Sequence, residues 1–278
     1  MQTIDLSVVL LIFLYVLCGS VAPILIELLV MSGAANASTM LVLLPSCVGQ
    51  SLSALSNSSS FHVGTICWSA VLLLTVLDLA SARLTNQGMI DAGSTVYTVV
   101  HCSGTVFTAL FAVFLLRRHI NSTQWFGILI ISIGLCVISF GMKNEGNAMI
   151  DGILFILLGS VFHSLSYIVI EYSLVIVDNP VTPEFLCGML GLTGCFLNIT
   201  WQCVYTIPNY NVLVIQSVKE HNGDALTIIL AYIALTVASC VSSTCFYNLL
   251  TKAGSSTTGV IKALQAVLTF VTSHYAFC

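Results

Sequence analysis

The stretch AGSTVYTVVHCSGTVFTALFAVF, from Ala92 to Phe114, is long and apolar enough to cross a bilayer. It carries His101 about 13 Å from its start at helical rise. A second stretch, AGSSTTGVIKALQAVLTFVTSHY from Ala253 to Tyr275, aligns with the first without a gap, and Lys262 falls opposite His101. Both stretches therefore predict a membrane helix with an ionisable side chain near midspan.

The composition of the whole chain agrees with this prediction. Of its 278 residues, 58% are hydrophobic and only 6% are charged, whereas soluble domains carry about a quarter charged residues. Lipid cannot satisfy free backbone groups, and the apolar runs are far longer than a barrel strand, so the sequence predicts an all-α membrane protein. The lipid bilayer is its first partner. A formal net charge of −4 gives no basis for a nucleic-acid partner.

Apolar runs bounded by turn residues predict about nine transmembrane helices. The expected spans are Leu6–Met31, Ala37–Leu55, Val63–Ala82, Ala92–Leu116, Gln124–Gly141, Ile150–Val175, Thr182–Ile207, Ala225–Leu250 and Ser256–Cys278. The third span has the least certain end, because helical residues continue from Asn86 to Ile90. Gly188, Gly191 and Gly194 gather on one side of the seventh span and predict a close helix contact.

The alignment also predicts an internal repeat of about five helices. Residues 1–141 would form the first repeat, 142–149 a linker, and 150–278 a second repeat with four helices. An odd number of spans turns the second repeat upside down, which gives an inverted repeat with a pseudo-two-fold axis in the membrane plane. His101 and Lys262 would then lie at similar depth and face a shared cavity. On this reading the last helix of a five-plus-five arrangement is missing.

Several segments resemble the drug/metabolite transporter superfamily, with its EamA-like members and the solute carriers related to nucleotide-sugar and triose-phosphate transporters. They are the pattern D-x-x-x-x-x-x-x-N-Q-G from Asp78 to Gly88, GTVFTALFAVFLLRR from Gly104, QWFGILIISIG from Gln124, and CFYNLLTKAGSSTTGVIKALQAVLTFV from Cys245. The resemblance implies a bundle of membrane helices around a central cavity that opens alternately to each side. It also implies that the lysine of the ninth helix lies in the substrate cavity. It implies no particular substrate, because His101-Cys102-Ser103-Gly104 stands where related carriers often have an arginine-glycine pair.

Lys262 and His101 head the candidates for substrate binding, since an ionisable side chain at midspan is costly unless it has a function or a partner. Lys262 could hold a phosphate, carboxylate or sulfonate, or could form a structural pair with Asp78 or Glu171. His101 could titrate during transport, or could be an interior histidine with a local hydrogen bond. Tyr97 and Gln265 lie about one turn from these residues and could orient a solute or join helices.

Three acidic residues are candidates for proton or ion coupling. Glu27 and Glu171 occupy the first and sixth spans, which correspond in the two repeats, and Asp78 lies in the third. Each has a structural alternative: Glu27 at the headgroup level, Asp78 as a tie between helices, and Glu171 as a structural partner of Lys262. His163 ranks below these candidates, because a lone histidine in an apolar helix can form its hydrogen bonds with nearby groups.

We therefore expect a multi-pass transporter that moves a small polar or anionic metabolite, a small-molecule solute, by alternating access. The alternative is a non-transporting membrane scaffold that binds partner proteins. No hydrolase, metalloprotease or P-loop motif occurs, so no enzyme and no cofactor are expected. The 11 cysteines are scattered through apolar runs, so no metal is expected either. The expected location is an endomembrane such as the Golgi or lysosome, or the plasma membrane, and a homodimer is left open.

Overall fold

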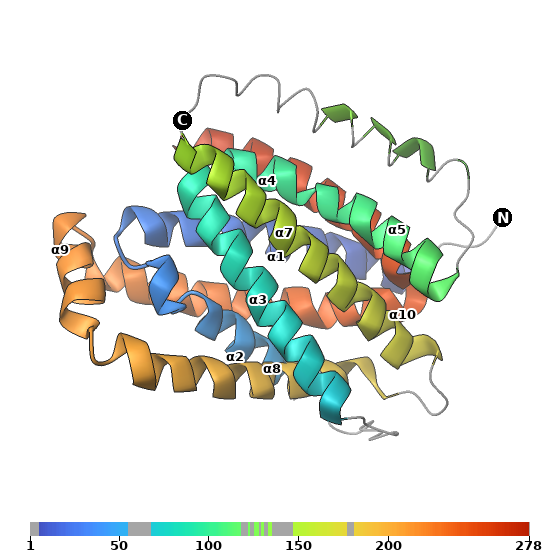
Figure 1. Cartoon of the computed structure of the whole chain (residues 1–278), viewed down its shortest axis with the longest axis horizontal. Coiled ribbons are helices and arrows are strands. Elements are labelled where there is room, and N and C mark those ends of the chain that lie inside the picture. The colour runs from blue at the N-terminus through green and yellow to red at the C-terminus, as the bar shows by residue number, and fades with distance from the viewer. Residues whose placement is uncertain are drawn as a thin grey trace. The chain divides into compact units, whose positions relative to one another are not determined.

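The computed structural model describes residues 6–54, 68–117, 147–176 and 181–277, together with 122, 125–127, 129–130 and 133–134. Throughout these residues the regular structure is helical (Figure 1). The longer elements are α1 (Leu6–Met31), α2 (Leu43–Ser53), α3 (Trp68–Ala92), α4 (Ser94–His101), α5 (Ser103–Leu116), α7 (Asn147–Glu171), α8 (Pro183–Trp201) and α10 (Ala225–Phe277). The shorter ones are η1 (Ala37–Thr39), η3 (Tyr172–Ile176), η4 (Gln202–Thr206), η5 (Asn211–Gln216) and α9 (Ser217–Glu220).

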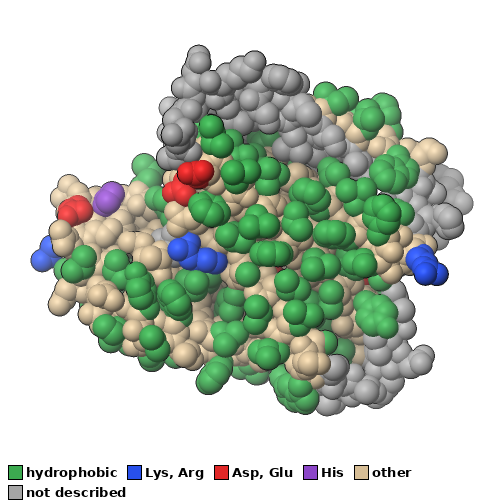
Figure 2. Space-filling view, in the orientation of Figure 1, with side chains coloured by type: hydrophobic (Ala, Val, Ile, Leu, Met, Phe, Trp, Pro, Cys, Tyr) green, Lys and Arg blue, Asp and Glu red, His purple; other side chains and the backbone are tan. Residues whose placement is uncertain are grey.

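Six helical segments of the described chain are long and apolar enough to cross a membrane: Ser7–Met31, Trp68–Ala92, Val99–Leu116, Met149–Val175, Pro183–Thr206 and Ala225–Ser255. Hydrophobic side chains are spread across the described surface seen in Figure 2, and charged ones are few. On α10, five exposed apolar residues follow helical spacing and form one outward stripe: Leu226, Ile229, Leu230, Ile233 and Val237. Such a surface suits lipid rather than water, so this is an integral, multi-pass, all-helical membrane protein.

The predicted spans agree with the structure to different degrees. The first is confirmed to the residue, and α7 with η3 reproduces the sixth. The third continues to Ala92, ten residues beyond its predicted end. Most of the fifth lies outside the described residues, so the predicted total of nine spans stays a prediction.

The second predicted span, Ala37–Leu55, is wrong as a single helix. A 3₁₀ turn at η1 is followed by Met40 in a left-handed conformation (φ 55°), and α2 has only 11 residues. At 1.5 Å per residue such a helix reaches about half of the hydrocarbon thickness. Polar side chains of η4 hold the break, since Gln202 Nε2 and Thr206 Oγ1 both donate to Thr39 O, at 2.6 and 3.2 Å. Hydropathy alone does not reveal this interruption.

The chain divides into two compact units, each discontinuous in sequence. Unit 1 comprises Met1–Val76 and Asp178–Leu249, and unit 2 comprises Leu77–Val177 and Leu250–Cys278. The borders of these units differ from the predicted boundary between the two repeats. The repeats themselves remain a prediction. Each unit takes residues from both halves of the chain.

Unit 1 packs α2 against α8 through small residues. An added Cβ on Gly188 would lie 2.4 Å from Ala54 Cβ, and one on Gly191 would lie 2.3 Å from Ser51 N. These two glycines therefore let the helix backbones approach, which confirms the predicted close contact on α8. The apolar core of this unit lies elsewhere, where Leu29 and Leu235 are fully buried among their neighbours.

Unit 2 packs α7 against the second part of α3. An added Cβ on Gly88 would lie 2.5 Å from Gly152 O, and one on Gly159 would lie 2.6 Å from Thr85 Cγ2. The same face of α7 bears a cross-helix hydrogen bond, from Ser81 Oγ to Gly159 O at 2.8 Å. Helices this close leave little room between their backbones, so small and hydroxyl side chains occupy the contact.

Two glycines of unit 2 interrupt helices in the same way. Gly93, between α3 and α4, has φ 85° and ψ 158°, and Gly254, within α10, has φ 78° and ψ 167°. Residues with a Cβ rarely adopt this conformation, so both positions require glycine. Gly254 falls in the predicted gap between the eighth and ninth spans, which are joined as the two parts of α10.

Candidate functional site

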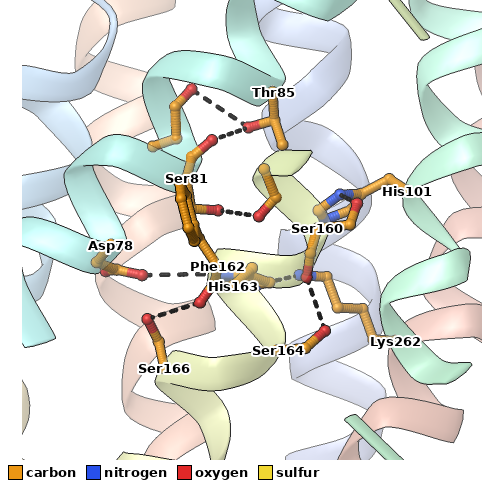
Figure 3. Close-up of polar contacts among 12 residues, drawn as sticks. Asp78, Ser81, Thr85, His101, Ser160, Phe162, His163, Ser164, Ser166 and Lys262 are labelled. Carbon is orange, nitrogen blue, oxygen red and sulfur yellow. Dashed lines mark hydrogen bonds and ion pairs between the residues drawn. The ribbon is translucent and has the colours of Figure 1, made fainter. Parts of the chain in front are cut away.

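Unit 2 holds a chain of three ionisable side chains that come from three helices. Asp78 lies on α3, His163 on α7 and Lys262 on the second part of α10. His163 Nδ1 lies 3.8 Å from Asp78 Oδ1, and His163 Nε2 contacts Lys262 Nζ on the other side of the ring. Figure 3 shows Asp78 and Lys262 on opposite sides of His163. The imidazole therefore bridges a carboxylate and an amine.

The protonation of His163 follows from these partners. The amino group of Lys262 can only donate when it is charged, so His163 Nε2 accepts and Nδ1 carries the ring proton. That proton faces the carboxylate of Asp78. The distance of 3.8 Å is an electrostatic contact rather than a direct hydrogen bond. The side chains of His163 and Asp78 are 25% and 34% exposed, so the protein does not fully enclose either of them.

Tyr167 covers Lys262 from the same helix that carries His163. Its ring centroid lies 5.3 Å from Lys262 Nζ and 4.6 Å from the centroid of the His163 ring. A cation at this distance from an aromatic face is attracted to it. The lysine thus has an aromatic and an imidazole contact, and neither neutralises its charge. Asp78 supplies the negative charge from the far side of His163.

His101, the last residue of α4, joins the same group. Its ring lies 5.6 Å from that of His163 and stacks on Tyr97 at 5.2 Å. Its Nδ1 lies 3.1 Å from Ser160 Oγ, and that hydroxyl donates to Ile156 O at 2.8 Å. Because the serine proton is used in this way, we assign the His101 proton to Nδ1, and Nε2 is left as an acceptor. We call Asp78, His101, His163 and Lys262 the polar cluster.

Hydrogen bonds to backbone carbonyls position α7 within the polar cluster. Ser81 Oγ ties α3 to Gly159 O, and Ser164 Oγ lies 2.8 Å from Gly104 O on α5 and 2.7 Å from Ser160 O. Ser160 and Ser164 flank His163 along α7 (Figure 3). Hydroxyl ties of this kind fix the helix positions without adding a charge.

Four of the residues in and around the contact of His163 with Asp78 and Lys262 were predicted from the sequence as candidates. Lys262, His101, Tyr97 and Asp78 all lie in unit 2, and each contacts His163 or a neighbour of His163. His101 and Lys262 both contact His163, and the predicted shared cavity remains a prediction. Gln265 lies on α10, one turn beyond Lys262, in a partly buried position.

The other two acidic candidates lie away from the polar cluster. Glu171 is fully buried and its Oε2 accepts the backbone N–H of Ser255 at 3.0 Å. Ser255 begins the second part of α10, so this carboxylate binds the helix N-terminus that Gly254 creates, a favourable place for a negative charge. Glu27 is partly buried on α1, in unit 1. A coupling role for either residue remains a prediction.

His163 is the residue whose importance the sequence analysis missed. Its sequence signal was weak, because a single histidine in an apolar helix is also typical of a locally satisfied side chain. A stronger signal was available in Gly159-Ser160, which marks a small, polar face of α7 one turn before His163. A helical wheel places Ser160, His163, Ser164 and Tyr167 on that face.

The polar cluster can bind an anion through Lys262 and can accept or release protons through Asp78 and the two histidines. Among the described residues, no group of three or more His, Cys, Asp or Glu side chains could hold a metal ion. The chemistry available to the described part of the site is therefore charge recognition and proton exchange.

Comparison with known proteins identifies a similar protein but does not indicate a function. No protein-family model matches the chain. The chain is similar to the uncharacterized protein C12G12.12 of Schizosaccharomyces pombe, with 28% identity over 126 residues. That match covers 45% of this chain and 38% of the yeast protein. It assigns no activity.

Proposed function

We propose that this protein is a multi-pass membrane transporter that carries a small polar or anionic metabolite by alternating access. The observation that supports this most is the Asp78–His163–Lys262 chain on three helices of unit 2. In this proposal Lys262 binds the negative group of the solute. His101 and Tyr97 contribute a hydrogen-bond acceptor and an aromatic surface beside it.

Charged side chains inside a membrane raise the free energy of the protein. A charged residue at the centre of a membrane helix costs about 2.5 to 3.5 kcal/mol on insertion scales. Replacing a buried ion pair by packed hydrophobic residues is often neutral or stabilising, so an ion pair alone is weak evidence of a stabilising role. Ionisable residues inside membrane proteins more often mark a path for solutes or protons.

A five-plus-five inverted repeat would explain why two helix breaks look alike. Gly93 and Gly254 share one unusual backbone conformation, and His101 and Lys262 follow them at the same spacing. Both side chains contact His163. In transporters built from inverted repeats, discontinuous helices meet near the bilayer midplane and hold the substrate there. The two breaks support the same arrangement here.

A binding screen followed by uptake tests the proposal. Purified protein would be heated with inorganic phosphate, methanesulfonate, succinate and UDP-glucose, because a ligand that binds the folded state raises its stability. Each anion that shifts the unfolding midpoint would then be offered to proteoliposomes and to protein-free liposomes. Uptake by the proteoliposomes alone is the expected result. A complete absence of both shift and uptake would instead favour the non-transporting scaffold.

A further inference from the structure

The polar cluster carries balanced charges, and this balance has a consequence for what can cross with the solute. Within the described residues, the titratable side chains that contact His163 are Asp78 from α3, His101 from α4, Tyr167 from α7 and Lys262 from α10. Tyr97 stacks on His101, and Cys102 interacts with Lys262. Of these, only Asp78 and Lys262 carry a charge in their ordinary forms near pH 7, and their charges cancel. With both side chains in these charged forms, the empty site is neutral.

Other charged groups of unit 2 are engaged elsewhere. Arg83 Nη1 donates to Gln87 Oε1 at 3.1 Å, and Gln87 Nε2 donates to both oxygens of Asp91 at 2.9 Å. Glu171 binds the backbone N–H of Ser255. None of these contacts joins the polar cluster. Within the described residues, Asp78 and Lys262 are therefore the charged side chains of the polar cluster.

We infer that the protein carries one proton together with each monoanionic solute that Lys262 binds, and that Asp78 binds this proton. The inference rests on the proposed transport function. A monoanion that enters the neutral site alone would leave a net charge of −1 in a low-dielectric environment, which is strongly unfavourable. A proton on Asp78 restores neutrality. Both the empty and the fully loaded sites can then change sides of the membrane.

His163 links the two events because it contacts both partners. When the solute binds, Lys262 Nζ donates to an oxygen of the solute instead of to His163 Nε2. His163 then no longer connects the positive charge of Lys262 to the carboxylate of Asp78, and that carboxylate loses part of its electrostatic stabilisation. Asp78, whose side chain is 34% exposed, then accepts a proton through a new O–H bond from water of the compartment to which the site is open. After the solute leaves on the other side, the carboxylic acid returns that proton to water and the bridge re-forms.

The test separates exchange from net accumulation in proteoliposomes. Counterflow exchange of labelled for unlabelled solute requires only that the solute-loaded site reorients across the membrane. Net uptake also requires that the empty site reorients back. Methanesulfonate is the first probe, because it keeps its charge at every working pH and does not cross lipid as a neutral acid. Inorganic phosphate and UDP-glucose serve if methanesulfonate does not exchange.

For the wild-type protein we expect accumulation of a monoanion driven by a pH gradient. One proton per monoanion predicts about tenfold accumulation inside vesicles that are one pH unit more alkaline than the medium. A potassium diffusion potential imposed with valinomycin should leave this uptake unchanged, because the transported pair is neutral. Uptake that follows the membrane potential and ignores the pH gradient would overturn the inference and leave the transport function standing.

Asp78→Asn imitates the permanently protonated carboxyl group. We expect this variant to keep counterflow and to lose the pH-driven accumulation, and its counterflow also shows that it is folded. Asp78→Glu restores a carboxyl group and should restore the accumulation. Asp151→Asn, which removes an exposed carboxylate from α7 outside the polar cluster, is the matched control and should behave as wild type.

Each remaining outcome has a clear meaning. Accumulation by Asp78→Asn at the wild-type level would overturn the role of Asp78, and so would loss of its counterflow while Asp78→Glu exchanges normally. Absence of counterflow in the wild-type protein for all three probes would count against transport itself, and the inference would fall with it.

Discussion

At the level of single residues, His163 contacts two groups of opposite charge and keeps them apart. Asp78 and Lys262 do not touch, because the imidazole ring lies between them. A direct ion pair between the two would be harder for a solute to displace. An imidazole can accept from one side while it donates to the other, so the ring transmits the attraction and leaves Lys262 available.

The hydroxyl of Ser160 fixes the neighbouring His101, and its removal should destabilise the protein. Ser160→Ala leaves the Nδ1–H of His101 without the acceptor it has in the structure, so we expect the free energy of unfolding to fall by about 1 to 3 kcal/mol. The measurement is unfolding of the purified protein in mixed micelles by titration with sodium dodecyl sulfate.

Ser166→Ala is the matched control on the same helix. Within the described residues the Ser166 hydroxyl donates to Phe162 O of the same helix, at 3.1 Å, so its loss should lower the free energy of unfolding by about 1 kcal/mol or less, the net value of an ordinary hydrogen bond. Equal losses in the two variants would show that the contact between His101 and Ser160 contributes nothing.

Single residues also show what sequence could and could not predict about the site. A lysine and a histidine at matching midspan positions predicted Lys262 and His101, because charge in lipid is costly wherever the helix lies. The bridge by His163 depends on the distance between α7 and α10, which residues distant in sequence determine. No local pattern contains that distance.

At the level of the elements, glycines with left-handed φ angles divide the helices of unit 2. Gly93 separates α3 from α4, and a Cβ placed on it would meet nothing within 4 Å. Gly93→Ala therefore changes the backbone energy without a clash. Because φ 85° with ψ 158° is almost restricted to glycine, we expect a loss of about 1 to 3 kcal/mol in the free energy of unfolding.

Gly259→Ala provides the comparison on α10. This glycine is helical, and its added Cβ would lie 3.6 Å from Thr105 Cγ2, an ordinary contact. Alanine is the better helix former by about 1 kcal/mol, so the variant should be neutral or slightly more stable in the same micelle titration. A Gly93→Ala variant as stable as Gly259→Ala would contradict the strain argument.

Element boundaries were predicted well where the sequence contains a local stop. The first helix ends at Met31 because Ser32-Gly33 forms a turn, with Gly33 at φ 70°. The prediction failed at residues 37–55, where the break before α2 depends on Gln202 and Thr206 from a distant helix. Apolar composition predicts that a segment lies in the membrane, and it does not predict whether the segment is one helix.

At the level of the whole molecule, exposed apolar side chains identify the surface that lipid covers. Ile233 on α10 is 56% exposed, and Leu235, two residues further on the same helix, is fully buried in the core of unit 1. A membrane protein should accept a large apolar side chain at the first position and reject it at the second.

Tryptophan substitutions test this assignment. Ile233→Trp should change the free energy of unfolding by less than about 1 kcal/mol, whereas Leu235→Trp should lower it by about 1 to 3 kcal/mol through overpacking. The yield of monodisperse protein in size-exclusion chromatography should follow the same order. Equal tolerance at both positions would show that this face of α10 does not meet lipid.

The class of the molecule was predictable because composition reports it directly. With 6% charged residues the chain cannot present a water-soluble surface, and the described structure is helical throughout. The division into two units was not predictable, because each unit combines segments that lie far apart in sequence. Contacts between distant segments decide that division, and neither hydropathy nor turn residues encode them.

The most direct test of the proposed function is counterflow exchange in proteoliposomes that contain Lys262→Ala. Loss of a hydrogen bond to a charged group is worth about 1.5 to 3 kcal/mol, so exchange at low solute concentration should fall by about 10- to 100-fold. Lys252→Ala, which removes an exposed lysine from the same helix, should exchange at the wild-type rate. If Lys262→Ala exchanges every transported anion as fast as Lys252→Ala does, Lys262 does not bind the solute and the proposed site is wrong.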